Sequence, residues 1–94
     1  MATFMLFGKY SLDALRGIST KRTVKVNNLI KKFEGKVIAS YVLLGENDLV
    51  LIVDFPNMEH AMKTSIALSK LTDIAFLTTP AMTVKEFDKM MAKG

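Results

Sequence analysis

The chain has no cysteine and no tryptophan, and it contains a single histidine, His60. The absence of cysteine excludes disulfide bonds, thiolate metal sites and cysteine nucleophiles, and one histidine cannot form a histidine-based zinc site. The five glycines do not have the spacing of a phosphate-binding loop. We therefore expect neither a metal site nor a cofactor.

Long apolar runs are also missing, since none approaches the roughly 20 residues that a membrane-spanning helix requires. No positively charged region precedes the N-terminal apolar stretch and no small-residue cleavage site follows it, so we expect no signal peptide and a cytoplasmic location. Of the 94 residues, 50% are apolar and 23% are charged. This composition is typical of one globular domain, which we expect to span residues 1–94.

Basic residues are concentrated in one segment. Between Ala14 and Lys36, seven basic residues stand against one acidic residue, Glu34, so this segment carries +6 and the other 71 residues carry −2. Such a face is most often a solvated helix surface, and contact with nucleic acid or another anionic surface is the alternative. Because no stacking aromatic residues or recognition motif accompany the bases, we expect nucleic-acid binding to be weak and non-specific at most.

The apolar pattern predicts four strands and three helices. Apolar, β-rich runs bounded by turn residues predict strands over Thr3–Tyr10, Lys36–Leu44, Asp48–Phe55 and Ile74–Met82. Apolar residues at spacings of three and four predict helices between Ser11 and Gly35, from Asn57 to about Leu71, and from Thr83 onward. Ser11 and Asn57 are suitable N-caps, and Gly17 followed by Ser19 predicts that the first helix is kinked or divided.

This order of elements, βαββαβ followed by a helix, predicts an α+β, ferredoxin-like fold with a four-stranded antiparallel sheet. Right-handed crossovers give the strand order 4-1-3-2 and place both main helices on one face. Pro80 cannot donate a ladder hydrogen bond, so the fourth strand is expected at an edge. The inner face of the second main helix is predicted to be built of small and medium side chains: Ala61, Met62, Ser65, Leu68 and Ser69.

Both faces of the predicted sheet are apolar. In the first strand, Phe4 and Leu6 lie on one side and Met5 and Phe7 on the other. In the second strand, Ile38 and Val42 lie opposite Val37 and Leu43. In the third strand, Leu49, Leu51 and Val53 lie on one side and Val50 and Ile52 on the other. An antiparallel sheet with one wet face alternates apolar with polar residues, and two helices cover only one face. We therefore expect a homodimer packed sheet to sheet, with a monomer whose terminal helix folds beneath the sheet as the alternative.

Several segments of the chain match a known family. They are Gly8–Ser11, Lys21–Thr23, Gly35, Tyr41–Asp48 and Val53–Pro56. On these residues the chain resembles, along nearly its whole length, the GYD domain family, whose members have the dimeric α+β barrel fold. The family is named for a Gly, Tyr, Asp signature at the hairpin, which Gly45 and Asp48 match, while Asn47 stands in place of the tyrosine. The resemblance implies the fold and a homodimer but no particular reaction.

Arg22 lies on the apolar stripe of the first helix, and a buried guanidinium requires an anion. The topology brings Tyr10, Arg22, Tyr41 and Asp48 to one mouth between helix and sheet, so these four are the candidate ligand-binding residues. We expect Arg22 to be largely buried and to engage either the Asp48 carboxylate, as a structural ion pair, or a bound ligand. Extension of its side chain to solvent is the remaining alternative.

Other candidates for chemistry are weaker. Asp48 and Asp54 lie six residues apart on one strand, roughly 20 Å at about 3.3 Å per residue, which is too far for a carboxylate pair or a shared metal. His60 falls on the outward side of the second main helix. We expect it to be exposed and without a role, with a general base or a haem ligand as the alternative.

Three functions fit these observations. The first is a homodimer, or a higher homo-oligomer, that binds a small apolar or anionic molecule in a pocket between helix and sheet. The second is a cofactor-free enzyme of the monooxygenase or isomerase kind, with a tyrosine or Asp48 as acid or base, and the third is an interaction module that uses the basic helix. Catalysis needs an acid or base in a closed pocket and binding needs only the pocket, so we favour binding.

Overall fold

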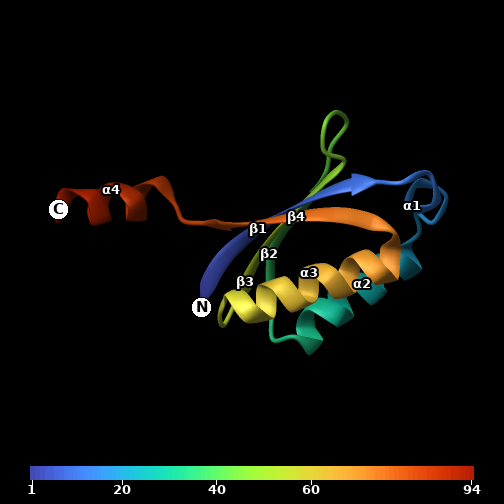
Figure 1. Cartoon of the computed structure of the whole chain (residues 1–94), viewed down its shortest axis with the longest axis horizontal. Helices are drawn as coiled ribbons and strands as arrows, with labels where there is room; N and C mark the ends of the chain where they lie inside the picture. The colour runs from blue at the N-terminus through green and yellow to red at the C-terminus, as the bar shows by residue number, and fades with distance from the viewer.

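A computed structural model describes all 94 residues as four strands and four helices (Figure 1). In chain order these are β1 (Ala2–Tyr10), α1 (Leu12–Arg16), α2 (Thr20–Lys32), β2 (Lys36–Val42), β3 (Leu49–Phe55), α3 (Met58–Thr72), β4 (Ile74–Ala81) and α4 (Val84–Ala92). The helices α2 and α3 lie side by side on one face of the sheet, as predicted. The α+β class is therefore confirmed.

The sheet is antiparallel throughout, and its strand order is β2-β3-β1-β4. This order is the predicted 4-1-3-2 arrangement. Pro80 lies on the edge strand β4, where its missing N–H interrupts no inner ladder. The hairpin strands are shorter than predicted, since β2 ends at Val42 and β3 begins at Leu49. Residues 43–48 form the loop between them, at whose base Leu43 donates its N–H to the Asp48 carbonyl at 2.7 Å.

Each helix begins at a side chain that caps it. Ser11, Ser19, Asn57 and Thr83 each accept a hydrogen bond from the backbone N–H three residues further on. Because Gly17 ends α1 and Ser19 caps α2, the apolar stripe between Ser11 and Gly35 is divided between two helices. Of the two predicted possibilities, division is the one that is found.

The core lies between the sheet and the helix pair. Its largest fully buried side chains are Leu6, Ile30, Val53, Phe55 and Leu68, and the rings of Phe4 and Phe55 meet edge to face at 6.0 Å. Of the residues predicted for the inner face of α3, Ala61, Ser65 and Leu68 are buried and Ser69 is half-buried, and Thr64, which was not predicted, is buried as well. The prediction was wrong for Met62, which is 55% exposed.

A β-bulge changes which residues of β2 face the helices. The pairing register shifts by one residue between Val37 and Ala39, so Ile38 is the extra residue. Val42 pairs with Leu49 on the helix side of the sheet, whereas Tyr41 pairs with Val50 on the opposite side. The predicted grouping of Ile38 with Val42 was wrong, because it assumed an unbroken alternation along the strand.

The face of the sheet opposite α2 and α3, called the open face here, is apolar in its centre. The pairing register places Met5, Phe7, Val50, Ile52 and Leu77 on it. Its ends are polar, with Lys9 at one end and Thr3, Lys36 and Asp54 at the other. The terminal helix α4 buries none of its residues and extends away from the sheet (Figure 1), so it does not fold beneath this face.

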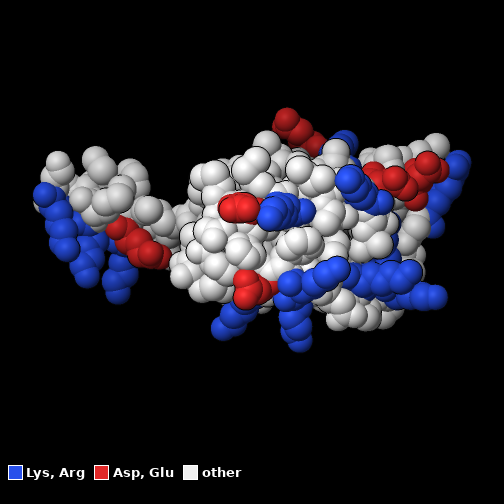
Figure 2. Space-filling view, turned by 60° about the horizontal axis from the view of Figure 1, so that its bottom comes forward, with Lys and Arg blue, Asp and Glu red and all other residues white.

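The helix layer carries most of the basic segment. Figure 2 shows lysine and arginine side chains in a row along this side of the molecule, with few acidic groups between them. None of the four helices combines the length and the apolar character needed to span a membrane.

The close packing around Gly35 yields a stability prediction. A Cβ at this position would lie 2.6 Å from the Phe55 ring and 2.7 Å from the Ile30 side chain, both fully buried. Gly35→Ala should therefore lower the free energy of unfolding by about 1–3 kcal/mol, measured by urea denaturation. Gly17→Ala is the control, since its nearest neighbour is the movable end of Arg22, and losses of equal size in the two variants would contradict the prediction.

Candidate functional site

A cavity of about 190 Å³ lies between α2 and the helix side of the sheet. Three of the four predicted site residues line it, namely Tyr10, Arg22 and Tyr41, whereas Asp48 does not. Its apolar wall is formed by Ile18, Val26, Val42, Leu49, Leu51 and Ile74, and its further polar groups belong to Ser19, Thr23, Asn27 and Ser40. The cavity is therefore an apolar space with a few hydroxyl and amide groups and one cation.

Arg22 is half-buried beside the break between α1 and α2. Its backbone N–H donates to the Ser19 hydroxyl at 3.0 Å, within the cap of α2. Its guanidinium donates through Nη1 to the Ala14 carbonyl, at the negative end of α1, and lies 5.5 Å from the centre of the Tyr10 ring. None of the ion pairs in the structure includes Arg22.

The predicted ion pair between Arg22 and Asp48 is therefore not formed, and Arg22 is less buried than expected. The break at Gly17 explains both differences, because it brings the last turn of α1 next to the first turn of α2. A Cβ on Gly17 would lie 3.2 Å from Nη1 of Arg22. Because glycine has no side chain, the guanidinium can lie directly against the Gly17 backbone. The Ala14 carbonyl and the Tyr10 ring are the contacts that the Arg22 guanidinium makes in place of the Asp48 carboxylate.

Asp48 instead joins the hairpin loop to the end of β1. Its carboxylate accepts the backbone N–H of Tyr10 at 2.9 Å and lies 3.5 Å from the Lys9 ammonium, while its own N–H donates to the Gly8 carbonyl at 2.8 Å. Lys9 also donates to the Gly45 carbonyl at 3.2 Å. Asp48 thus forms an ion pair, as one alternative predicted, but with Lys9 of β1 and not with Arg22.

The two tyrosines do not share one environment. Tyr10 stands on the helix side of the sheet, opposite Ile74, and contacts the Arg22 guanidinium. Tyr41 contributes to the cavity wall, but its pairing with Val50 directs its side chain to the open face, where it is 60% exposed. The structure therefore brings the side chains of Tyr10 and Arg22 into contact, leaves Tyr41 at the exposed edge of the cavity, and joins Asp48 to the backbone of Tyr10 and not to Arg22.

Four polar lining residues were missed in the sequence: Ser19, Thr23, Asn27 and Ser40. Three of them recur at intervals of four residues on α2 and so share one stripe of the helix, next to Arg22 and Val26. From that spacing, the sequence could have predicted that these three side chains form one polar wall of the cavity. No such signal existed for Ser40, because the bulge in β2 decides on which face it lies.

His60 does not line the cavity, and its side chain contacts two other parts of the chain. Its Nε2 lies 2.9 Å from a carboxylate oxygen of Glu34, and its Nδ1 lies 2.8 Å from the Asn57 side-chain oxygen. The side chain is 31% exposed, so it is less exposed than expected. It connects the start of α3 to the turn after α2. In the whole structure, no three His, Asp or Glu side chains lie close enough together to hold a metal ion.

The role of Asp48 can be tested by substitution. Asp48→Ala removes the acceptor of the half-buried Tyr10 N–H and should lower the free energy of unfolding by about 1–3 kcal/mol. Asp48→Asn keeps one oxygen acceptor and should lose less. Lys9→Ala removes only an exposed partner, so urea denaturation that shows it as damaging as Asp48→Ala would overturn this assignment.

Comparison with known proteins agrees with this architecture. The family model for the GYD domain matches residues 4–91, which is nearly the whole chain. A search of curated proteins returned no match. The match covers β1 from Phe4 onward, the other three strands, both main helices, the Gly45 and Asp48 hairpin and the residues around the cavity. On this extent of agreement, the chain belongs to the GYD domain family.

Proposed function

We propose that the protein binds a small organic carboxylate in the cavity between α2 and the sheet. The observation that carries this proposal is the state of Arg22, which lines an apolar cavity and has no carboxylate partner in the chain. A planar guanidinium forms paired, charge-assisted hydrogen bonds with a carboxylate. A ligand carboxylate would supply the anion that Arg22 lacks.

The remaining lining suits the apolar part of such a ligand. Aliphatic side chains from α2 and three strands form most of the wall, and the Tyr10 ring adds an aromatic surface beside the guanidinium. The volume of about 190 Å³ is below that of most drug-sized sites, which favours a small metabolite. Thr23, Asn27 and Ser40 offer hydrogen bonds that distinguish one carboxylate from another.

Binding is favoured over the alternative of a cofactor-free monooxygenase or isomerase. The cavity is lined by no carboxylate and no imidazole, so its only acid or base candidates are the phenols of Tyr10 and Tyr41. Asp48, the other residue considered for that role, is held by Lys9 and the Tyr10 backbone. The lining thus suits recognition better than proton transfer.

We also propose that the protein is a homodimer in which two open faces pack together. The apolar centre and polar ends of this face have the composition of a protein interface. None of α2, α3 and α4 covers it, and Leu77 at its edge is 65% exposed. Association would remove these side chains from water, at roughly 25 cal/mol for each Å² of apolar surface buried.

Ligand binding is tested with benzoate, an aromatic carboxylate of small size. Benzoate should raise the Tm of the wild-type protein with increasing concentration, because a ligand that binds only the native state stabilises it. Arg22→Met should lose this increase, whereas Arg16→Met, at an exposed arginine outside the cavity, should keep it. Benzyl alcohol is the neutral control, and the proposal fails if benzoate stabilises Arg22→Met as much as the wild type.

The homodimer is tested by light scattering at micromolar concentration. The wild-type mass should be near twice the 10.5 kDa of one chain, and Leu77→Lys should reduce it toward one chain, because the dimer would bury the added charges. Val24→Lys, at an exposed residue of α2, is the matched control and should remain a dimer. A wild-type mass near 10.5 kDa would refute the dimer.

A further inference from the structure

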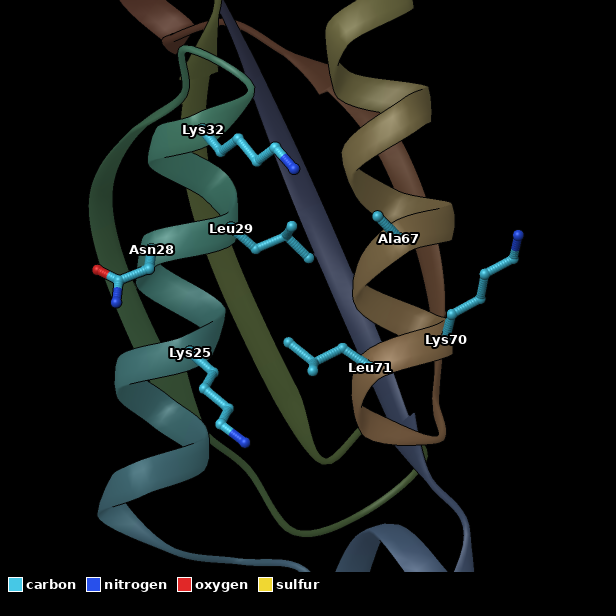
Figure 3. A pocket seen from close by; sticks show the side chains of 7 residues that line it. All are labelled: Lys25, Asn28, Leu29, Lys32, Ala67, Lys70 and Leu71. Atoms are coloured by element: carbon cyan, nitrogen blue, oxygen red, sulfur yellow. The ribbon is translucent and has the colours of Figure 1, made fainter.

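A second concave surface lies between α2 and α3, on the side of the helix layer away from the sheet. This groove has a volume of about 590 Å³. Its floor is formed by Leu29 of α2 and by Ala67 and Leu71 of α3. Figure 3 shows Lys25 and Lys32 extending from α2 toward α3 over this floor, whereas Lys70 points away from it. The groove thus combines an apolar base with a basic rim.

The lysines of the groove have no partner within the chain. Lys25, Lys32 and Lys70 take part in none of the ion pairs, and no acidic residue lines the groove. The floor is partly open to solvent, since Leu71 is 42% exposed. Unpaired cations beside exposed apolar side chains call for a partner with both apolar and acidic groups.

We propose that this groove binds an acidic amphipathic helix of another protein. A third helix would lie along the α2–α3 pair, with its apolar stripe on Leu29, Ala67 and Leu71. Lys25 and Lys32 are seven residues apart on one face of α2, which corresponds to about 10.5 Å along the axis. Acidic residues seven positions apart on the partner helix have the same spacing and would meet both lysines.

The charge of the groove argues against a second copy of this chain as the occupant. Two copies that met through this face would bring their lysines together. The terminal helix α4, although amphipathic, carries Lys85 and Lys89 against Glu86 and Asp88, and Lys93 follows at its C-cap. It therefore has no excess of acidic groups to meet the lysines of the groove. A nucleic acid would use the lysines but would leave the apolar floor unused, and no aromatic residue lines the groove for stacking.

The test uses a synthetic helix of about 20 residues, with leucines on one stripe and glutamates on both sides of it. NMR titration of the full chain should shift the amide signals of Leu29, Ala67 and Leu71. A peptide of the same composition, permuted so that the leucines share no stripe, should bind at least about tenfold more weakly. Equal binding of the two peptides, or stronger binding of an oligonucleotide at matched salt, would overturn the proposal.

Charge reversal gives a second, independent measurement. Lys32→Glu should weaken binding of the acidic peptide at least about tenfold, whereas Lys31→Glu makes the same change at the next residue and should have little effect. Lys31 lies on the other side of α2, beside Gly35 and Val37. The double variant Lys25→Glu/Lys32→Glu should prefer a peptide with lysines in place of the glutamates, and equal losses in Lys31→Glu and Lys32→Glu would refute the site.

Discussion

The carboxylate of Asp48 accepts the backbone N–H of Tyr10, and the N–H of Asp48 donates to the Gly8 carbonyl. These two bonds join the hairpin loop to the end of β1 and align β3 beside it. Because Ser11 follows Tyr10 and caps α1, the same junction fixes where α1 begins. The last turn of α1 then supplies the Ala14 carbonyl that holds Arg22, so the geometry of the cavity depends on one carboxylate that does not line it.

Helix α2 has different chemistry on its two sides. The side toward the sheet presents Arg22, Val26 and small polar residues to the cavity, and the side toward α3 presents Lys25, Leu29 and Lys32 to the groove. No residue lines both. The bases of this helix are thus divided among its sides. Arg22 lines the cavity, Lys25 and Lys32 lie over the groove, and Lys31 lies on a third side beside Gly35.

The elements that rest on local signals were predictable: caps such as Ser11 and Asn57, the break after Gly17, and the edge position of the Pro80 strand. The strand order followed from the handedness of the crossovers. The partner of Arg22 was not predictable, because it depends on how two short helices meet at Gly17. The orientation of Tyr41 was not predictable for another reason. One extra residue in β2, Ile38, reverses which side chains of the strand face the helices, and no sequence feature marks this bulge.

That extra residue, Ile38, is also the one residue of β2 that the strand could lose without a change of register. A chain that lacked it would keep all the cross-strand partners of β2, because the residues before the bulge and those after it each retain their own register with β3. Elsewhere in the strand, losing one residue would exchange the two faces of everything beyond it. Deletion of Ile38 would therefore leave Ser40 and Tyr41 opposite Leu51 and Val50, the partners that they have now.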